Sequence, residues 1–147
     1  MYGRVLIAVD DEQERNELGA YVTELYRDCI GAVTIDSGDA SILNGASGQR
    51  QAEAGRAYDF IIVGDTPSGV AGIVGLRQAG SETPVYMIGD LYPSIGKSVT
   101  NPEAMQDVLD HFAAKFGATQ YADMADFTID LMHIVNELAW ERMRPGN

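Results

Sequence analysis

Residues 59–69 read DFIIVGDTPSG, an apolar run that ends at a glycine and an acid. Continuous apolar runs of this length are typical of strands buried on both faces of a parallel sheet. The loop after the run contains Pro67 and Gly69, and residues 70–79 then predict a short helix. The stretch therefore predicts a strand, a loop and a helix, with Asp65 at the carboxyl end of the strand.

The same alternation of apolar runs and helical patterns extends over the 147 residues. Strands are predicted at 4–9, 32–35, 59–63, 84–88 and 118–122, and helices at 12–27, 39–54, 70–79, 101–116 and 123–143. Residues 36–39 predict a turn after the second strand. Strands that alternate with helices favour one parallel sheet covered on both faces, so we expect a single α/β domain over residues 1–147.

The composition is that of a globular protein, with 46% apolar and 22% charged residues. No apolar run is long enough to span a membrane, the acidic N-terminal stretch does not resemble a signal peptide, and Cys29 is the one cysteine. These features predict a cytoplasmic protein. The net charge of −12 repels nucleic acid and anionic lipid, so we expect neither as a partner.

Acidic residues follow three of the predicted strands. Asp10 and Asp11 follow the first strand, Asp65 follows the third and Asp90 follows the fourth. In open α/β sheets, ligands bind outside the carboxyl ends of the strands. Carboxylates gathered there are typical ligands of a hard divalent cation, so this edge predicts a weak Mg²⁺ site.

Two stretches resemble response-regulator receiver domains. VLIAVDDE, residues 5–12, is similar to the first strand and acidic pair of that family. YDFIIVGDTPSGVAGIVGLR, residues 58–77, is similar to its phosphoacceptor strand, the following loop and the next helix. The resemblance implies a flavodoxin-like, doubly wound sheet with strand order 2-1-3-4-5 and helices on both faces.

The residues that carry phosphotransfer in that family are poorly matched. Counted from Asp59, the acceptor position falls on Gly64. The expected threonine or serine is replaced by Gly89 or Asp90, and the expected lysine by Met124. The chain therefore resembles a pseudo-receiver, which implies a non-catalytic interaction, signalling or assembly module that is not phosphorylated.

An alternative reading keeps the phosphotransfer. If each strand is one residue longer than the family pattern, Asp65 becomes the acceptor and Asp90 takes the place of the hydroxyl residue. Asp10 and Asp11 would then hold Mg²⁺, and Lys97 would supply the missing cation.

A narrower resemblance covers the second half of the chain. Two stretches are similar to the N-terminal wing domain of Orn/Lys/Arg decarboxylases: TPVYMIGDLYPS, residues 83–94, and the stretch from HFAAKFGATQYADMADF, which begins at residue 111, to residue 147. Those enzymes use pyridoxal phosphate, and the wing domain often mediates their assembly into large oligomers. The chain lacks a pyridoxal-binding lysine context, so the resemblance implies an assembly domain and no enzyme activity of its own.

Other motifs predict no further chemistry. GKS at residues 96–98 lacks the glycine that a phosphate loop needs at position 91. His111 and His133 have no partner at metal-ligand spacing. The acidic loop after the first strand also argues against FMN, and no cobalamin signature occurs. We therefore expect no cofactor other than Mg²⁺.

The last predicted helix has two apolar faces. One face, which we expect on the sheet, contains Phe127, Leu131, Ile134, Val135 and Leu138. The opposite face contains Ile129, Met132, Trp140 and Met143. Because a surface helix is normally polar there, this face predicts contact with a protein partner or a homodimer. The alternative is that Trp140 and Met143 fold back over the helix end or touch the preceding helix.

The connection at residues 89–101 is a second candidate contact surface. Loops of this length are often functional. Its apolar tip contains Tyr92 and Ile95, and Lys97 lies beside them in the sequence. The alternative is a loop packed on itself over the edge of the sheet.

Overall fold

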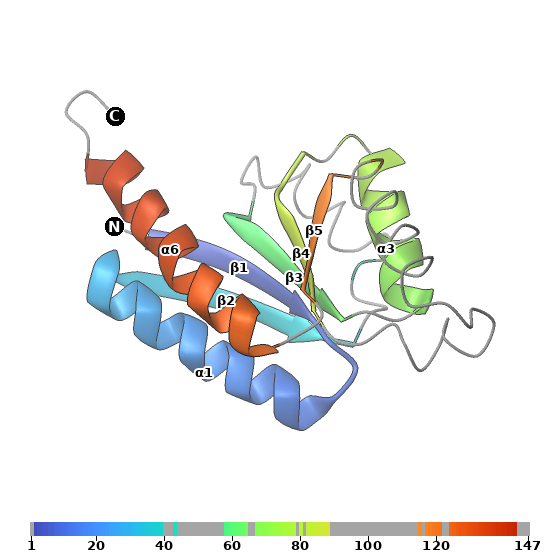
Figure 1. Ribbon diagram of the computed structural model, residues 1–147, viewed down its shortest axis with the longest axis horizontal. Helices are drawn as coiled ribbons and strands as arrows, with labels where there is room; N and C mark the ends of the chain where they lie inside the picture. Colours follow the sequence, from blue (N-terminus) through green and yellow to red (C-terminus); the bar gives the residue numbers. More distant parts are fainter. Residues whose placement is uncertain are drawn as a thin grey trace.

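The computed structural model describes the residues that form the sheet and the helices packed on it (Figure 1). The described residues are 2–39, 43, 58–64, 67–78, 80, 82–88, 115, 117–121 and 124–143. Asp65, Asp90, Tyr92, Ile95 and Lys97 lie outside this set, as do most residues of the helices expected at 39–54 and 101–116. Among the described residues, no helix is long and apolar enough to cross a membrane.

Five parallel strands form one sheet in the order β2-β1-β3-β4-β5. The strands are β1 (Tyr2–Ala8), β2 (Ala32–Gly38), β3 (Phe60–Gly64), β4 (Val85–Ile88) and β5 (Ala118–Tyr121). This order confirms the flavodoxin-like topology. It also places the carboxyl ends of β1 and β3 side by side, because Ala8 pairs with Val63.

Strand β2 is longer than its sequence predicts. The turn expected at residues 36–39 is wrong, because β2 continues to Gly38 and pairs with β1 from Ala32 onward. Aspartate is a poor strand residue. Here, however, the carboxylate of Asp36 accepts hydrogen bonds from the Arg4 guanidinium at 2.8 Å and from the Tyr58 hydroxyl at 2.7 Å. These contacts come from segments distant in the chain, so the local pattern at residues 36–39 could not show them.

Helices cover both faces of the sheet. Helices α1 (Glu12–Cys29) and α6 (Met124–Met143) lie on one face, and α3 (Pro67–Gln78) lies on the other (Figure 1). On the α3 face, the described buried cluster includes Leu6, Val63, Ile73, Leu76 and Met87. The two-sided covering explains why the strands read as continuous apolar runs, since side chains on both faces are buried.

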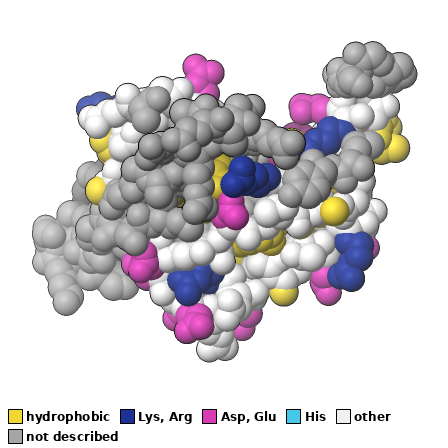
Figure 2. Space-filling view, turned by 180° about the vertical axis from the view of Figure 1, so that it is seen from behind, with side chains coloured by type: hydrophobic (Ala, Val, Ile, Leu, Met, Phe, Trp, Pro, Cys, Tyr) yellow, Lys and Arg dark blue, Asp and Glu magenta, His cyan; other side chains and the backbone are white. Residues whose placement is uncertain are grey.

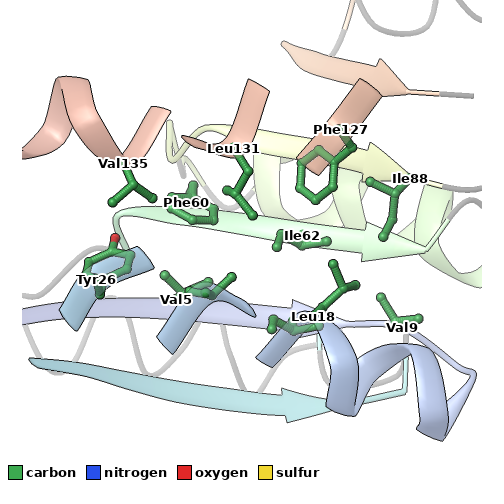
Figure 3. Close-up of a cluster of buried hydrophobic side chains, with 12 residues drawn as sticks. Val5, Val9, Leu18, Tyr26, Phe60, Ile62, Ile88, Phe127, Leu131 and Val135 are labelled. Atoms are coloured by element: carbon green, nitrogen blue, oxygen red, sulfur yellow. The ribbon is translucent and has the colours of Figure 1, made fainter. Parts of the chain in front are cut away.

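The core under α1 and α6 is built from alternate strand residues. Figure 3 shows Phe127, Leu131 and Val135 pointing from α6 toward Phe60 and Ile62 of β3. Aromatic packing continues across this cluster: the rings of Phe60 and Phe127 lie on either side of Tyr86, with centroid distances of 5.7 and 6.2 Å. The α6 residues expected on the sheet are thus buried or half-buried, which confirms the orientation of that helix.

Helix α3 begins three residues earlier than expected, at Pro67. Proline suits the first turn of a helix because its fixed φ is helical and its missing N–H has no partner there anyway. Glycines let this helix lie close to the end of β3 and to Leu43. A Cβ on Gly69 would overlap the carbonyl oxygen of Gly64, and one on Gly72 would lie 2.6 Å from Cδ1 of Leu43.

Candidate functional site

The acidic edge lies where β1 ends and α1 begins. Asp10 and Asp11 are both exposed there. Asp11 is the N-cap of α1, and its Oδ1 accepts a hydrogen bond from the backbone N–H of Glu14 at 2.9 Å. Partial burial raises the pKa of the Glu14 carboxyl most, and the negative charges of Asp11 and Glu17 raise it further. The carboxylate of Glu14 therefore lies near Asp11, whose Oδ1 is engaged in capping, and the Arg15 guanidinium lies close by, donating to the carbonyl of Val9 at 2.9 Å.

Gly64 occupies the last position of β3, beside this acidic pair. It pairs with Ile88 of β4. A Cβ placed on Gly64 would lie 3.6 Å from Cα of Val9 and 3.9 Å from the backbone nitrogen of Asp10. These are ordinary contact distances, so a Cβ fits there without displacing a neighbour. The last position of β3 therefore accommodates a Cβ beside the backbone of residues 8–10, but it carries no functional group.

The expected four-carboxylate cation site is not tested by the described residues. Asp10 and Asp11 lie together, but Asp65 and Asp90 fall outside the description. Within the described part of the chain, no group of three or more histidine, cysteine or acidic residues could hold a metal ion. The loop residues proposed for contact, Tyr92, Ile95 and Lys97, are likewise outside it.

A polar cluster at the opposite edge of the sheet was not anticipated from the sequence. Asp59 lies directly before β3. Its carboxylate accepts a hydrogen bond from the Tyr26 hydroxyl at 2.7 Å and forms an ion pair with Arg142 near the end of α6. The backbone N–H of Arg4 donates to the same carboxylate at 3.3 Å. Burial, and then the hydrogen bond to Asp59, raises the pKa of Tyr26. The cluster joins α1, β1, β3 and α6.

No sequence signal identified this cluster. Asp59 directly precedes an apolar strand without a recognisable motif, and Arg142 has the pattern of an ordinary cation in the last turn of a helix. The partners are 33 and 83 residues apart in the chain. Only the parallel sheet brings them together. The chemistry of the cluster is structural, because a buried tyrosine and a paired carboxylate hold the ends of two helices against the sheet.

The two histidines and the cysteine show no sign of a reactive site where they are described. His133 is exposed on α6, and His111 lies outside the described residues. Cys29 is half-buried at the end of α1, and its Sγ lies 3.2 Å from Oδ1 of Asn136, to which the thiol donates. This contact links α1 to α6.

A surface groove runs between α1 and the edge strand β2, with a volume of about 460 Å³. Its lining includes Arg15, Thr23 and Arg27 from α1 and Ser37 from β2. Arg15 is partly committed, since its Nη1 donates to the carbonyl of Val9 at 2.9 Å. On the face shown in Figure 2, acidic and basic side chains of the described residues are interspersed, with no broad basic patch among them.

The outer face of α6 is apolar and exposed. Ile129, Met132, Trp140 and Met143 are the exposed large hydrophobic residues of the described part of the chain. Trp140 is 74% exposed, so it does not fold back over the helix end within the described residues. The exposure is what the interface prediction requires, but the contact itself stays a prediction.

Comparisons with known proteins identify structures that have a similar fold. No protein-family model matches the chain, and no curated protein matches it. A response regulator from Colwellia psychrerythraea has a similar structure, with a TM-score of 0.55 and 15% identity over 95% of this chain and 98% of that one. A response regulator receiver protein from Sinorhizobium medicae is similar with a TM-score of 0.53 and 14% identity, over 96% of this chain and 97% of that one.

A third similar structure is named an oxidoreductase, from Corynebacterium diphtheriae, with a TM-score of 0.53 and 13% identity over 95% of this chain and 96% of that one. At such identities the likeness concerns the fold alone. The narrower resemblance to the decarboxylase wing domain is not shown by these comparisons. The strand order, the acidic pair after β1 and the two similar response regulators together show that the chain has the flavodoxin-like fold of a receiver domain.

Proposed function

We propose that this protein is a receiver-like module that acts through protein contacts and does not carry a phosphoryl group. The observation that supports this most is the glycine at the end of β3. A Cβ on Gly64 would lie 3.9 Å from the backbone nitrogen of Asp10 without a clash, yet residue 64 has no side chain. A receiver acceptor needs its carboxylate beside the acidic pair that binds the metal ion.

Electrostatics also argue against a phosphoryl group at this edge. Asp65 follows Gly64 directly, and a phosphoaspartate there would add negative charge to an edge that already carries Asp10 and Asp11. Like charges at short distance are costly unless cations offset them. Helix α6 begins at Met124, the position where the family resemblance expects the lysine that fulfils this role. A weakly held Mg²⁺ at the acidic pair is the remaining candidate.

The outer face of α6 supplies the contact surface of the proposed module. Tryptophan and methionine residues that are exposed on a free subunit are enriched in the centres of protein interfaces, where the partner buries them. Trp140 and Met143 are 74% and 67% exposed, whereas Phe127, Leu131 and Val135 on the inner face of the same helix are buried. A helix that needed only to cover the sheet would be polar on its outer face.

Intact-protein mass spectrometry tests the absence of phosphotransfer. The protein is incubated with acetyl phosphate and Mg²⁺, beside the Asp65→Asn variant and a working receiver domain as positive control. We expect a mass gain of one phosphoryl group in the control and no gain in this protein. A gain that disappears in Asp65→Asn would overturn the proposal and make Asp65 the acceptor.

The Gly64→Asp variant tests the geometric argument itself. Because a Cβ at residue 64 meets only ordinary contacts, the new carboxylate should reach the side of the acidic pair. An added carboxylate ligand should strengthen Mn²⁺ binding by about ten-fold or more, measured by calorimetry with Mn²⁺ as the probe. Gly75→Asp, on an exposed position of α3 with nothing within 4 Å, is the charge-matched control. Equal affinities in both variants would contradict the placement of residue 64.

A further inference from the structure

The exposed apolar residues of α6 are spaced symmetrically about Asn136. Ile129 and Met132 lie seven and four residues before Asn136, and Trp140 and Met143 lie four and seven residues after it. All four are exposed: Ile129 by 57%, Met132 by 44%, Trp140 by 74% and Met143 by 67%. The spacing reads the same from either end of the helix.

Helical geometry puts these residues on one stripe. At about 100° per residue, the four apolar side chains and Asn136 fall within an arc of about 80°. The stripe is about 21 Å long at 1.5 Å per residue. It lies opposite Phe127 and Leu131, which are buried against the sheet. We call Ile129, Met132, Asn136, Trp140 and Met143 the outer stripe.

We propose that the outer stripe binds a second copy of this chain, with the two α6 helices antiparallel and Asn136 on the two-fold axis. This inference rests on the proposed role of the protein as a contact module and names its partner. A two-fold contact is self-complementary, so each residue must meet its mirror position. The spacing satisfies this condition, because Ile129 meets the partner's Met143 and Met132 meets the partner's Trp140.

The chemistry of the paired residues fits this register. Methionine adapts to aromatic surfaces and its sulfur packs favourably at a ring edge, which suits Met132 against a tryptophan. Asparagine can both donate and accept, so two Asn136 side chains can bond across the axis. Asn136 is also held from its own chain, because its Oδ1 accepts from the Cys29 thiol at 3.2 Å.

The available area indicates a weak dimer. The four exposed fractions correspond to roughly 400–500 Å² of side-chain surface in each copy. A standard stable interface buries about 800 Å² from each partner. We therefore expect dimers that form in a concentration-dependent way and dissociate on dilution.

Charge beside the stripe makes the association depend on salt. One flank of the stripe carries exposed acids, namely Asp126, Asp130, Glu137 and Glu141. In a two-fold pair of antiparallel helices, this flank of both copies comes to the same side of the axis. The acids of the two copies then repel each other, and salt screens the repulsion. Added salt should therefore strengthen the dimer, although it weakens contacts between opposite charges.

Sedimentation analysis of the full chain at low and high salt tests self-association. We expect a dimer fraction that grows with concentration and with salt. Trp140→Asp should weaken dimerisation by about ten-fold or more, as expected for an aromatic residue central to an interface. Gln78→Asp adds the same charge at an exposed position of α3 and should leave dimerisation unchanged. A protein that stays monomeric at all concentrations and salts would overturn the inference.

Disulfide trapping tests the register. In a Cys29→Ser background, the single variant Asn136→Cys should crosslink with itself, because residues on the axis come within disulfide range. Ile129→Cys should crosslink with Met143→Cys in a mixture but not with itself. Self-crosslinking of Ile129→Cys would indicate parallel helices and overturn the antiparallel arrangement. The outcome is independent of the acetyl phosphate experiment, so failure here and failure of the phosphotransfer proposal can be told apart.

Discussion

Replacement of Gly3 by alanine should destabilise the protein strongly, although the change adds only one methyl group. Gly3 lies in β1 beneath the Tyr26–Asp59 pair. A Cβ at this position would overlap the ring of Tyr26 and lie 2.8 Å from Oδ2 of Asp59. Real Cβ atoms do not occupy such positions, so the ring or the strand must shift.

The structure sets the magnitude of this effect. The Tyr26 ring is fully buried and its hydroxyl donates to Asp59, so it cannot move without loss of packing and of that hydrogen bond. Overpacking a core costs about 1–3 kcal/mol. The weakened hydrogen bond adds about 0.5–1.5 kcal/mol. We expect Gly3→Ala to lower the free energy of unfolding by about 2–4 kcal/mol in total.

Gly19→Ala is the matched control, because the same methyl group meets nothing within 4 Å in α1. Alanine is the better helix residue, so this variant should gain about 0.5–1 kcal/mol. Urea unfolding followed by circular dichroism measures both. With a slope of about 2 kcal/mol per molar urea, Gly3→Ala should shift the midpoint down by about 1–2 M. A Gly3→Ala midpoint equal to that of the native protein would refute the reasoning.

Three further predictions concern the same core. Asp59→Asn should lower the free energy of unfolding by about 1–3 kcal/mol, because the partly buried Arg142 loses its charged partner; an unchanged urea midpoint would contradict this. The pKa of Tyr26 is raised in the folded protein, so its protonated hydroxyl stabilises the fold fully below about pH 10, and this stability is lost as the pH rises further. Phenylalanine does not titrate. Between about pH 9 and pH 11, Tyr26→Phe should therefore lose less stability than the native protein. Leu131→Ala should cost about 2–5 kcal/mol, whereas Met132→Ala on the outer side of the same helix should stay within about 0.5 kcal/mol in dilute protein; equal losses would mean that the helix is rotated.

The acidic edge was half predictable from the sequence. The rule that ligands bind beyond the carboxyl ends of parallel strands predicted Asp10 and Asp11 at that edge, and in the structure both residues follow β1, which ends at Ala8. The count from Asp59 put Gly64 at the acceptor position, but only the structure shows what surrounds that residue. Gly64 pairs with Ile88, and a Cβ on Gly64 would contact the backbone of Val9 and Asp10 at ordinary distances. These distances depend on how segments far apart in the chain pack together, so a local pattern does not give them.

The sequence by itself determined the alternation of strands and helices, the covering of both sheet faces and the two apolar faces of α6. These follow from the local periods of strands and helices, which act over a few residues. The strand order 2-1-3-4-5 was expected only from the resemblance to receiver domains, and the pairing of the strands confirms it. Only the tertiary structure decided the extent of β2, the need for glycine at residue 3 and the joining of Tyr26, Asp59 and Arg142. Each of these depends on contacts between segments far apart in the chain. Such contacts exist only after the sheet has assembled, so no local pattern carries them.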